Sequence, residues 1–246
     1  MWLRAYEFGT FSVRGLEVPA VLLGTSPFIG AGQFGRKADF YYNHFFLQPE
    51  NITDLVTYAI QLGVNAIQVI GYPQIVEAVQ EAARRAGTDL FLIGTVGLGS
   101  IEREIQIMLD VGAQGVLIHG SLADRDMAFA RPYLSSLRER GLVTGIATHR
   151  PGRTIPRVEE MDEVEIILCP LNKLGRFMEP SVESTLQAIE ASSKRIMAMK
   201  PLAAGRLSPQ QGLSYISDKV AGFAVGVASK EEAEETFKIA QAYFGR

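Results

Sequence analysis

The sequence is poor in cysteine and has no long apolar run. Its 246 residues include one cysteine, Cys169, so an internal disulfide and a metal site built from several cysteines are both excluded. No stretch reaches the roughly 18 consecutive apolar residues of a membrane helix, and the N-terminus lacks the apolar core of a signal peptide. We therefore expect a cytoplasmic protein without a membrane partner, in which Cys169 is a small core residue.

The sequence also has no excess of basic residues. It contains 24 lysines and arginines against 27 aspartates and glutamates, which gives a net charge of −3. No basic run is interleaved with aromatic residues, as a nucleic-acid surface would require. The composition therefore argues against a nucleic-acid partner.

Hydrophobic residues make up 47% of the chain, enough for the core of a large α/β domain. Short apolar runs alternate with amphipathic segments, and several of these segments end at a glycine, such as Gly63 or Gly87. The predicted strands are residues 19–23, 65–70, 90–95, 115–118, 143–147, 165–169, 195–199 and 222–227. The predicted helices are residues 50–62, 74–86, 101–111, 126–140, 154–161, 180–192, 209–216 and 230–243.

Eight strand–helix units predict a single (β/α)8 barrel (TIM barrel) over residues 1–246. Alternating segments on both sides of Arg14 and Gly15 predict a β-hairpin within residues 1–18, ahead of the first barrel strand. A doubly wound open sheet has less support. The segment GTSPFIGAG after the first strand lacks the spacing of the dinucleotide-binding motif G-x-G-x-x-G.

One connection is unusually long. In a barrel, residues 25–49 follow the first strand onto the C-terminal rim, and connections of this length are usually lids or disordered segments. Their many aromatic residues argue against disorder: Phe28, Phe34, Phe40, Tyr41, Tyr42, Phe45 and Phe46. These side chains could cover a planar or apolar ligand, or pack on the rim or on another subunit, and the sequence leaves both possibilities open.

Residues 195–208, RIMAMKPLAAGRLS, place a lysine where a buried strand ends. Pro201 cannot join the strand ladder, so Lys200 lies at the strand end. The small residues 203–205 allow backbone N–H groups to approach an anion closely, with Arg206 nearby. The alternative is an ordinary turn that carries a solvated lysine.

Carboxylates are missing from the predicted strand ends, where active sites of this fold are built. Their absence argues against glycoside hydrolysis and against a divalent-metal site. The polar residues expected there are Ser26, Gln68, Tyr72, Thr95, His119, Thr148, His149, Arg150, Asn172, Lys173, Lys200 and Ser229. The basic ones favour an anionic or phosphate-bearing small molecule, unless most of them are solvated.

His119 ends an apolar strand, where it could act as a general acid or donate a hydrogen bond to a substrate carbonyl. It could equally be bonded to neighbouring backbone groups. Lys200 could form a Schiff base if it were desolvated, a use that we rank below anion binding.

Several segments resemble the aldo-keto reductases over nearly the whole chain. They include LLGT at residues 22–25, LGVNAI at 62–67, LIH at 117–119 and GLVTGI at 141–146. The segment MKPLAAGRL at residues 199–207 is the most specific, and VGVASKEE at 225–232 is similar to the last cofactor loop of the family. The resemblance implies the same barrel.

The resemblance also implies carbonyl reduction by a tetrad of Asp, Tyr, Lys and His. Here Gln68 takes the aspartate position and Val96 the lysine position, whereas His119 matches. Tyr72 lies one residue short of the tyrosine spacing and could fill that place only across a shortened turn. A tyrosine donates a proton near neutral pH only beside a tuning cation and its carboxylate, so we expect a degenerate tetrad and altered or slower redox chemistry.

The family binds NADP or NAD, and the resemblance implies one of these cofactors and no metal. The cofactor-binding residues that it assigns are Lys200, Leu202, Gly205, Arg206, Gly226, Ser229, Lys230 and Thr148. The acidic Glu232 weakens the case for the 2′-phosphate of NADP(H).

Two hypotheses follow. The first is a nicotinamide-nucleotide-dependent oxidoreductase of the aldo-keto reductase type with a degenerate tetrad. The second is a non-redox binding protein, or an enzyme recruited to a phosphorylated small molecule, with His119 as acid or base and Lys200 as anion clamp.

Overall fold

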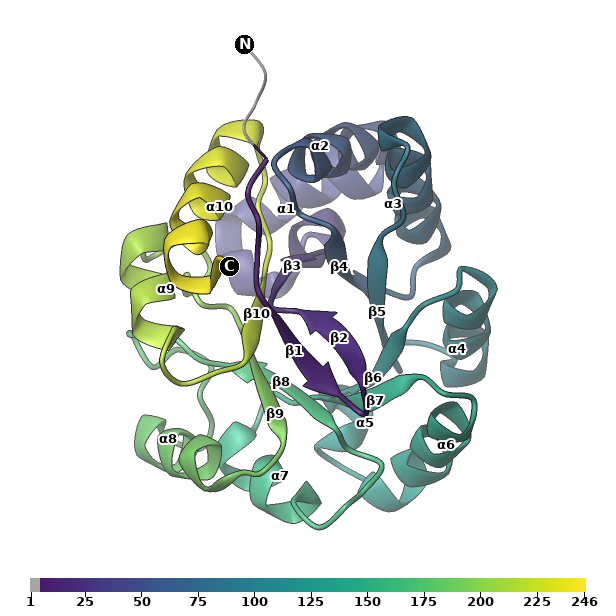
Figure 1. Ribbon diagram of the computed structural model, residues 1–246, viewed down its shortest axis with the longest axis vertical. Helices are drawn as coiled ribbons and strands as arrows, with labels where there is room; N and C mark the ends of the chain where they lie inside the picture. Colours follow the sequence, from purple (N-terminus) through teal and green to yellow (C-terminus); the bar gives the residue numbers. More distant parts are fainter. Residues whose placement is uncertain (1–4) are drawn as a thin grey trace.

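A computed structural model describes residues 5–246, and it contains a closed barrel of eight parallel strands (Figure 1). The strands pair in chain order and the last one closes on the first. They are β3 (Val21–Gly24), β4 (Ala66–Ile70), β5 (Phe91–Val96), β6 (Gly115–His119), β7 (Val143–Ala147), β8 (Ile166–Pro170), β9 (Arg195–Met199) and β10 (Gly222–Val225). The predicted (β/α)8 barrel is thus confirmed.

Helices form the outer ring around the barrel (Figure 1). The long ones are α2 (Pro49–Gln61), α3 (Pro73–Ala86), α4 (Ile101–Asp110), α6 (Met127–Glu139), α7 (Pro151–Val158), α8 (Val182–Ala191), α9 (Pro209–Ile216) and α10 (Lys230–Phe244). Helix α7 begins three residues before its predicted start because Pro151 occupies its first turn, where a missing N–H costs nothing. The short helix α5 (Gly120–Ala123) was not predicted.

A hairpin of β1 (Thr10–Val13) and β2 (Leu16–Pro19) lies across one end of the barrel (Figure 1). Arg14 and Gly15 both have positive φ, as a tight hairpin turn requires. Val13 and Val18 are buried against the residues that fill the barrel interior. The predicted hairpin is therefore present, although residues 1–4 of its predicted range lie outside the described residues.

The long connection after β3 is folded into short helical turns. These are η1 (Ser26–Ile29), η2 (Gly32–Lys37), α1 (Ala38–Tyr41) and η3 (Tyr42–Phe46). Phe28 and Phe45 are buried, and their ring centroids lie 5.1 Å apart. Phe40 is 64% exposed. The aromatic residues of this segment thus divide into an inner set that packs in the core and an outer set that faces solvent.

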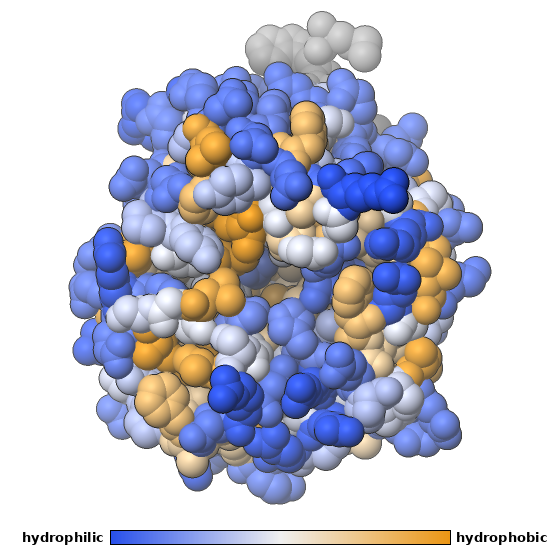
Figure 2. All heavy atoms as spheres, turned by 180° about the vertical axis from the view of Figure 1, so that it is seen from behind, coloured by the Kyte–Doolittle hydropathy of each residue, from blue (hydrophilic) through white to orange (hydrophobic). Residues whose placement is uncertain are grey.

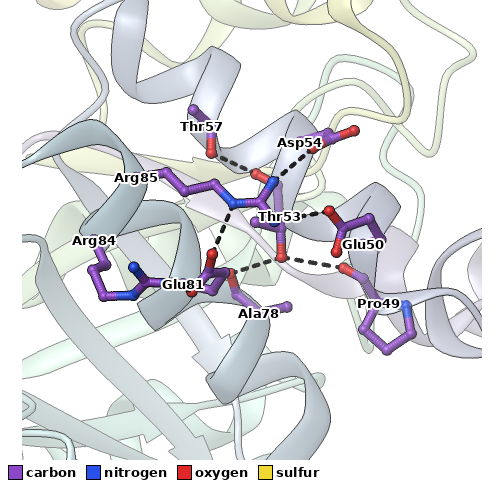
Figure 3. A network of polar contacts seen from close by, with 9 residues as sticks. All are labelled: Pro49, Glu50, Thr53, Asp54, Thr57, Ala78, Glu81, Arg84 and Arg85. Atoms are coloured by element: carbon purple, nitrogen blue, oxygen red, sulfur yellow. Dashed lines mark hydrogen bonds and ion pairs between the residues drawn. The ribbon is translucent and has the colours of Figure 1, made fainter.

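Helices α2 and α3 pack side by side and are joined by polar contacts (Figure 3). The Thr53 hydroxyl on α2 donates a hydrogen bond of 3.2 Å to the carbonyl of Ala78 on α3. The Arg85 guanidinium on α3 forms ion pairs with Glu50 and Asp54 on α2 and with Glu81 on its own helix. Within residues 5–246, no helix is both long and apolar enough to cross a membrane.

Candidate functional site

A pocket of about 390 Å³ opens at the carboxyl ends of the barrel strands. Figure 2 shows this face, opposite the hairpin, with a hollow near its centre. The pocket runs from Gln68 and Met199 at the barrel mouth to Arg206 in the β9–α9 loop and Gly226 after β10. Tyr41 and other residues of the long aromatic segment line it as well. This segment therefore contributes to the pocket and also packs in the core.

Three predicted rim residues point into the barrel mouth, because strand side chains alternate and each stands two positions after a residue of the barrel interior. They are Gln68 on β4, Thr95 on β5 and His119 on β6. The Gln68 amide donates a hydrogen bond of 2.7 Å to the Thr95 hydroxyl. Gln68 is thus a buried, neutral side chain where the family resemblance expects a carboxylate.

The structure brings His119, His149 and Lys200 together as a chain of nitrogen atoms. Lys200 Nζ lies 3.1 Å from His149 Nδ1, and His149 Nε2 lies 3.1 Å from His119 Nε2. At the far end, His119 Nδ1 accepts a hydrogen bond of 3.1 Å from the backbone N–H of Ser121. Of these three side chains, Lys200 lines the pocket, and the two histidines do not.

Asp124 at the end of α5 fixes the segment that carries His149. Its carboxylate accepts hydrogen bonds from the Thr148 hydroxyl, from the His149 backbone N–H at 2.8 Å and from the Thr154 hydroxyl at 2.7 Å. Asp124 was not predicted as a site residue, because a carboxylate that follows an unpredicted short helix gives no strand-end signal. His149 was predicted to lie on the rim but not to belong to the site.

Burial makes the whole chain of nitrogen atoms less basic than free side chains. Burial, and after it the charges of Lys200 and His119, lowers the pKa of His149 to about 3, against the opposing effect of Asp124. Burial and then Lys200 likewise lower the pKa of His119. Burial alone lowers the pKa of Lys200 to about 8. At neutral pH both histidines are therefore uncharged.

Tyr72 does not belong to the His119–His149–Lys200 chain of contacts. It precedes α3, is 37% exposed and packs edge to face on Phe46 of the long aromatic segment, with ring centroids 5.6 Å apart. It does not line the pocket. The structure thus places Tyr72 beside the aromatic segment and not beside His119.

The predicted cofactor residues fall into two groups. The residues that line the pocket are Lys200, Leu202, Gly205, Arg206 and Gly226. The others lie elsewhere: Thr148 is buried on Asp124, Ser229 caps α10, and the Lys230 ammonium lies 5.4 Å from the centre of the Tyr58 ring on α2.

Two backbone regions at the pocket differ in their free donors. In the β9–α9 loop, no backbone carbonyl among residues 5–246 accepts a hydrogen bond from the N–H of Leu202, Ala204 or Gly205. After β10, by contrast, the Glu232 carboxylate accepts the Ala228 N–H at 2.8 Å. An anion can therefore use the first region, whereas Glu232 already occupies the second.

No group of three or more His, Cys, Asp or Glu side chains within residues 5–246 is arranged to hold a metal ion. Cys169 is buried, and burial raises its pKa to about 12. The thiol is therefore neutral, as expected of a small core residue.

The geometry defines a (β/α)8 barrel with a hairpin at one end and a polar pocket at the other. Solved aldo-keto reductases share this fold. A protein from Pseudomonas aeruginosa assigned to that family is 20% identical, with a TM-score of 0.67, and the match covers 93% of this chain and 92% of that one. An aldo-keto reductase from Brucella melitensis is 14% identical, with a TM-score of 0.65 and coverage of 94% and 93%.

A solved structure that is not assigned to the aldo-keto reductases is also similar. Thiamine phosphate pyrophosphorylase from Pyrococcus furiosus is 16% identical, with a TM-score of 0.52, and the match covers 78% of this chain and 91% of that one. No protein-family model matches the sequence. No curated protein matches it either. At these identities the likeness establishes the fold, and the chemistry has to come from the site itself.

Proposed function

We propose that this barrel is a non-redox enzyme that binds a small phosphate-bearing molecule in the rim pocket. The observation that carries the proposal is one cavity lined both by Lys200, at the end of the His119–His149–Lys200 chain, and by residues of the β9–α9 loop whose backbone N–H groups have no backbone acceptor among residues 5–246. The cavity thus offers a reactive end and an anion-binding end to the same ligand.

The anion-binding end consists of donors that a phosphate group can use. Leu202, Ala204 and Gly205 line the cavity, no backbone carbonyl among residues 5–246 accepts their N–H groups, and Ala204 and Gly205 both have positive φ. Arg206 lines the cavity too and donates a hydrogen bond of 3.1 Å to the Ala203 carbonyl. A guanidinium carries five N–H donors, so this bond leaves others for a ligand.

The reactive end lacks the parts needed for carbonyl reduction by a tyrosine. Tyr72 packs on Phe46 and does not line the pocket. Gln68 carries no charge, and Val96 has no polar group to tune a phenol. His119 does not line the pocket and reaches Lys200 only through His149, so we assign it a supporting role behind the lysine.

A nicotinamide-nucleotide-dependent oxidoreductase is the second candidate. It is favoured by the position of the pocket, which is formed by the loops to which the family resemblance assigns the cofactor. Leu202, Gly205 and Arg206 would hold a phosphate of NADP or NAD. Thr148 is already bound to Asp124, and Met199 lines the pocket at the position where the family resemblance implies an aromatic that stacks on the nicotinamide. The residues thus fit the phosphate end of the nucleotide and not its nicotinamide end.

A calorimetric titration separates the two candidates. Inorganic phosphate should bind to the purified protein, and Arg206→Ala should weaken this binding roughly tenfold, because a charge-assisted contact contributes about 1.5 kcal/mol or more. Lys230→Ala is the matched control, since Lys230 faces α2 and should leave the affinity unchanged. Equal affinities of both variants would contradict the phosphate site. Micromolar binding of NADPH or NADH would favour the oxidoreductase.

A further inference from the structure

The contacts that connect Lys200 to His149 and His119 favour the neutral amine over the ammonium form. His119 Nδ1 faces two groups of Ser121: the backbone N–H at 3.1 Å and Oγ at 3.0 Å, whose hydroxyl donates to the Gly97 carbonyl at 2.7 Å. The backbone N–H can only donate, and when Nδ1 accepts it, a neutral His119 carries its proton on Nε2. In that arrangement the His119 N–H points at His149 Nε2, which accepts it, and the proton of His149 lies on Nδ1. His149 Nδ1 therefore donates to Lys200 Nζ at 3.1 Å. A neutral amine can accept this bond, whereas an ammonium has no lone pair.

A protonated Lys200 would break this pattern. Two N–H groups would face each other at one of the two contacts, because each neutral imidazole has only one proton to donate. No ion pair within residues 5–246 gives Lys200 a carboxylate partner, and Asp124 acts on the histidines. The Phe177 ring, whose centre lies 5.0 Å from Nζ, favours the charged form through a cation–π contact. Burial opposes it and lowers the pKa of Lys200 to about 8.

Lys200 is also placed for contact with a ligand. Its side chain lines the pocket, whereas His119 and His149 do not. Its backbone has a φ of +57°, a left-handed conformation that is strained for a residue with a side chain. Such strain is often found at functional sites, where the surrounding structure maintains it. The fold thus holds an amine at the mouth of the barrel at a cost in backbone energy.

We propose that Lys200 is a nucleophilic amine that forms an imine with the carbonyl group of the pocket ligand. This inference rests on the proposed function insofar as the ligand is small and anionic, and it adds that the ligand is an aldehyde or ketone. It replaces the role of anion clamp for this residue. The anion then binds farther along the pocket, at Arg206 and the loop N–H groups.

The reaction is balanced without an oxidant or reductant. The Lys200 nitrogen attacks the carbonyl carbon, so a C–N bond forms and the C=O π electrons move to oxygen. The two protons of the amine pass to that oxygen, which leaves as water when the C=N bond forms. His149 and His119 are positioning residues in this scheme, because they hold the amine in its neutral form and do not line the pocket.

Trapping with borohydride tests the imine directly. The intact protein is incubated with glyoxylate, a small aldehyde that carries a carboxylate, then reduced with sodium borohydride and mapped by peptide mass spectrometry. Borohydride transfers a hydride to the imine carbon and leaves a stable carboxymethyl-lysine. We expect Lys200 to be labelled at least tenfold faster than any of the other six lysines at pH 8. Labelling that follows solvent exposure, with exposed Lys173 ahead of Lys200, would overturn the inference.

Two variants control this experiment. Lys173→Ala removes an exposed lysine near the rim and should leave the Lys200 signal unchanged. Lys200→Met keeps the bulk of the side chain and should abolish the selective label, and its thermal unfolding curve shows whether it folds. A selective label that persists on another lysine of a folded Lys200→Met variant would overturn the assignment.

A second measurement needs no ligand. Competitive acetylation between pH 6 and pH 11 gives a titration midpoint for each lysine. At pH 7.5 the neutral fraction of Lys200 should exceed that of an ordinary lysine roughly two hundredfold, and His149→Phe should raise the Lys200 midpoint. A midpoint near that of the exposed lysines overturns the inference. Failure of phosphate to bind in the calorimetric titration overturns the proposed function alone, because the acetylation titration of Lys200 uses no ligand of the anion site.

Discussion

At the scale of single residues, the site depends on side chains that the ligand does not touch. The Asp124 carboxylate takes three hydrogen bonds from residues of the β7–α7 segment, and this fixes where His149 stands. His149 in turn contacts both Lys200 and His119. The protonation state of Lys200 therefore depends on His149, His119 and Asp124, which lie behind it in the rim.

The acid sensitivity of this line can be predicted from His149. Its pKa is about 3 in the folded protein and near 6.5 when unfolded, so the unfolded chain binds more protons between these values. The free energy of unfolding should therefore fall as the pH drops below 6.5. We expect His149→Phe to remove about 1–2 kcal/mol of the loss between pH 7 and pH 5.

Urea unfolding at pH 7 and at pH 5 measures this difference. His44→Phe is the matched control, since it changes a histidine outside the chain of nitrogen atoms and should retain the acid sensitivity of the wild type. If His149→Phe loses as much stability as the wild type on acidification, His149 is not held neutral by the fold. The groups that face it are His119, Lys200 and Asp124, and none of them is changed in this comparison.

Part of the site could be predicted at this scale. His119 and Lys200 are visible in the sequence because each ends a short apolar run, and a strand end in this fold marks the rim. Their connection through His149 could not be predicted, because it depends on side-chain directions in two different loops. Asp124 had no signal at all, since its helix is four residues long.

At the scale of elements, the ring of helices is held by packing and by local ion pairs. Arg85 connects α3 to α2 through Glu50 and Asp54, whereas neighbouring Arg84 forms its ion pair with Glu81 on its own helix (Figure 3). These two arginines make a matched pair, because they lie on one helix and differ mainly in whether they bridge to the next one.

We expect Arg85→Ala to lower the free energy of unfolding by about 1 kcal/mol and Arg84→Ala by less than about 0.5 kcal/mol. The bridge consists of charges near the surface, so added salt screens it and the difference between the two variants should shrink in 1 M NaCl. Chemical denaturation at low and high salt checks both points. If both variants lose the same free energy of unfolding, the ion pairs between α2 and α3 do not stabilise the protein beyond the packing of the two helices.

Helices and strands could be predicted where a single hydrophobic pattern determines them. The barrel strands are short apolar runs buried on both sides, and this signal places β7 and β9 at their observed residues. The turns of η1, η2, α1 and η3 could not be predicted, since their geometry follows from how Phe28 and Phe45 pack against the barrel. Their sequence shows only that the segment is too aromatic to be disordered.

At the scale of the whole molecule, the two ends of the barrel serve different purposes. One end carries the pocket, and the hairpin β1–β2 closes the other with the side chains of Val13 and Val18. The interior between them is filled with side chains, so the barrel is a packed core and not a channel. The closed end can therefore be tested for stability without changing any residue of the pocket.

Val18 and Leu16 on the same hairpin strand provide that test. Val18 is fully buried against the barrel interior, whereas Leu16 is 37% exposed. Val18→Asn loses apolar burial and places an amide where it has no partner, so we expect it to cost about 3 kcal/mol, while Leu16→Asn should stay within about 0.5 kcal/mol of the wild type. Thermal and urea unfolding measure both changes. If Val18→Asn were as stable as Leu16→Asn, burial of Val18 would not stabilise the fold, and the hairpin would not be part of the packed barrel interior. If it is less stable but still folded, its Lys200 titration midpoint should be unchanged, because the amine is set by contacts at the opposite end.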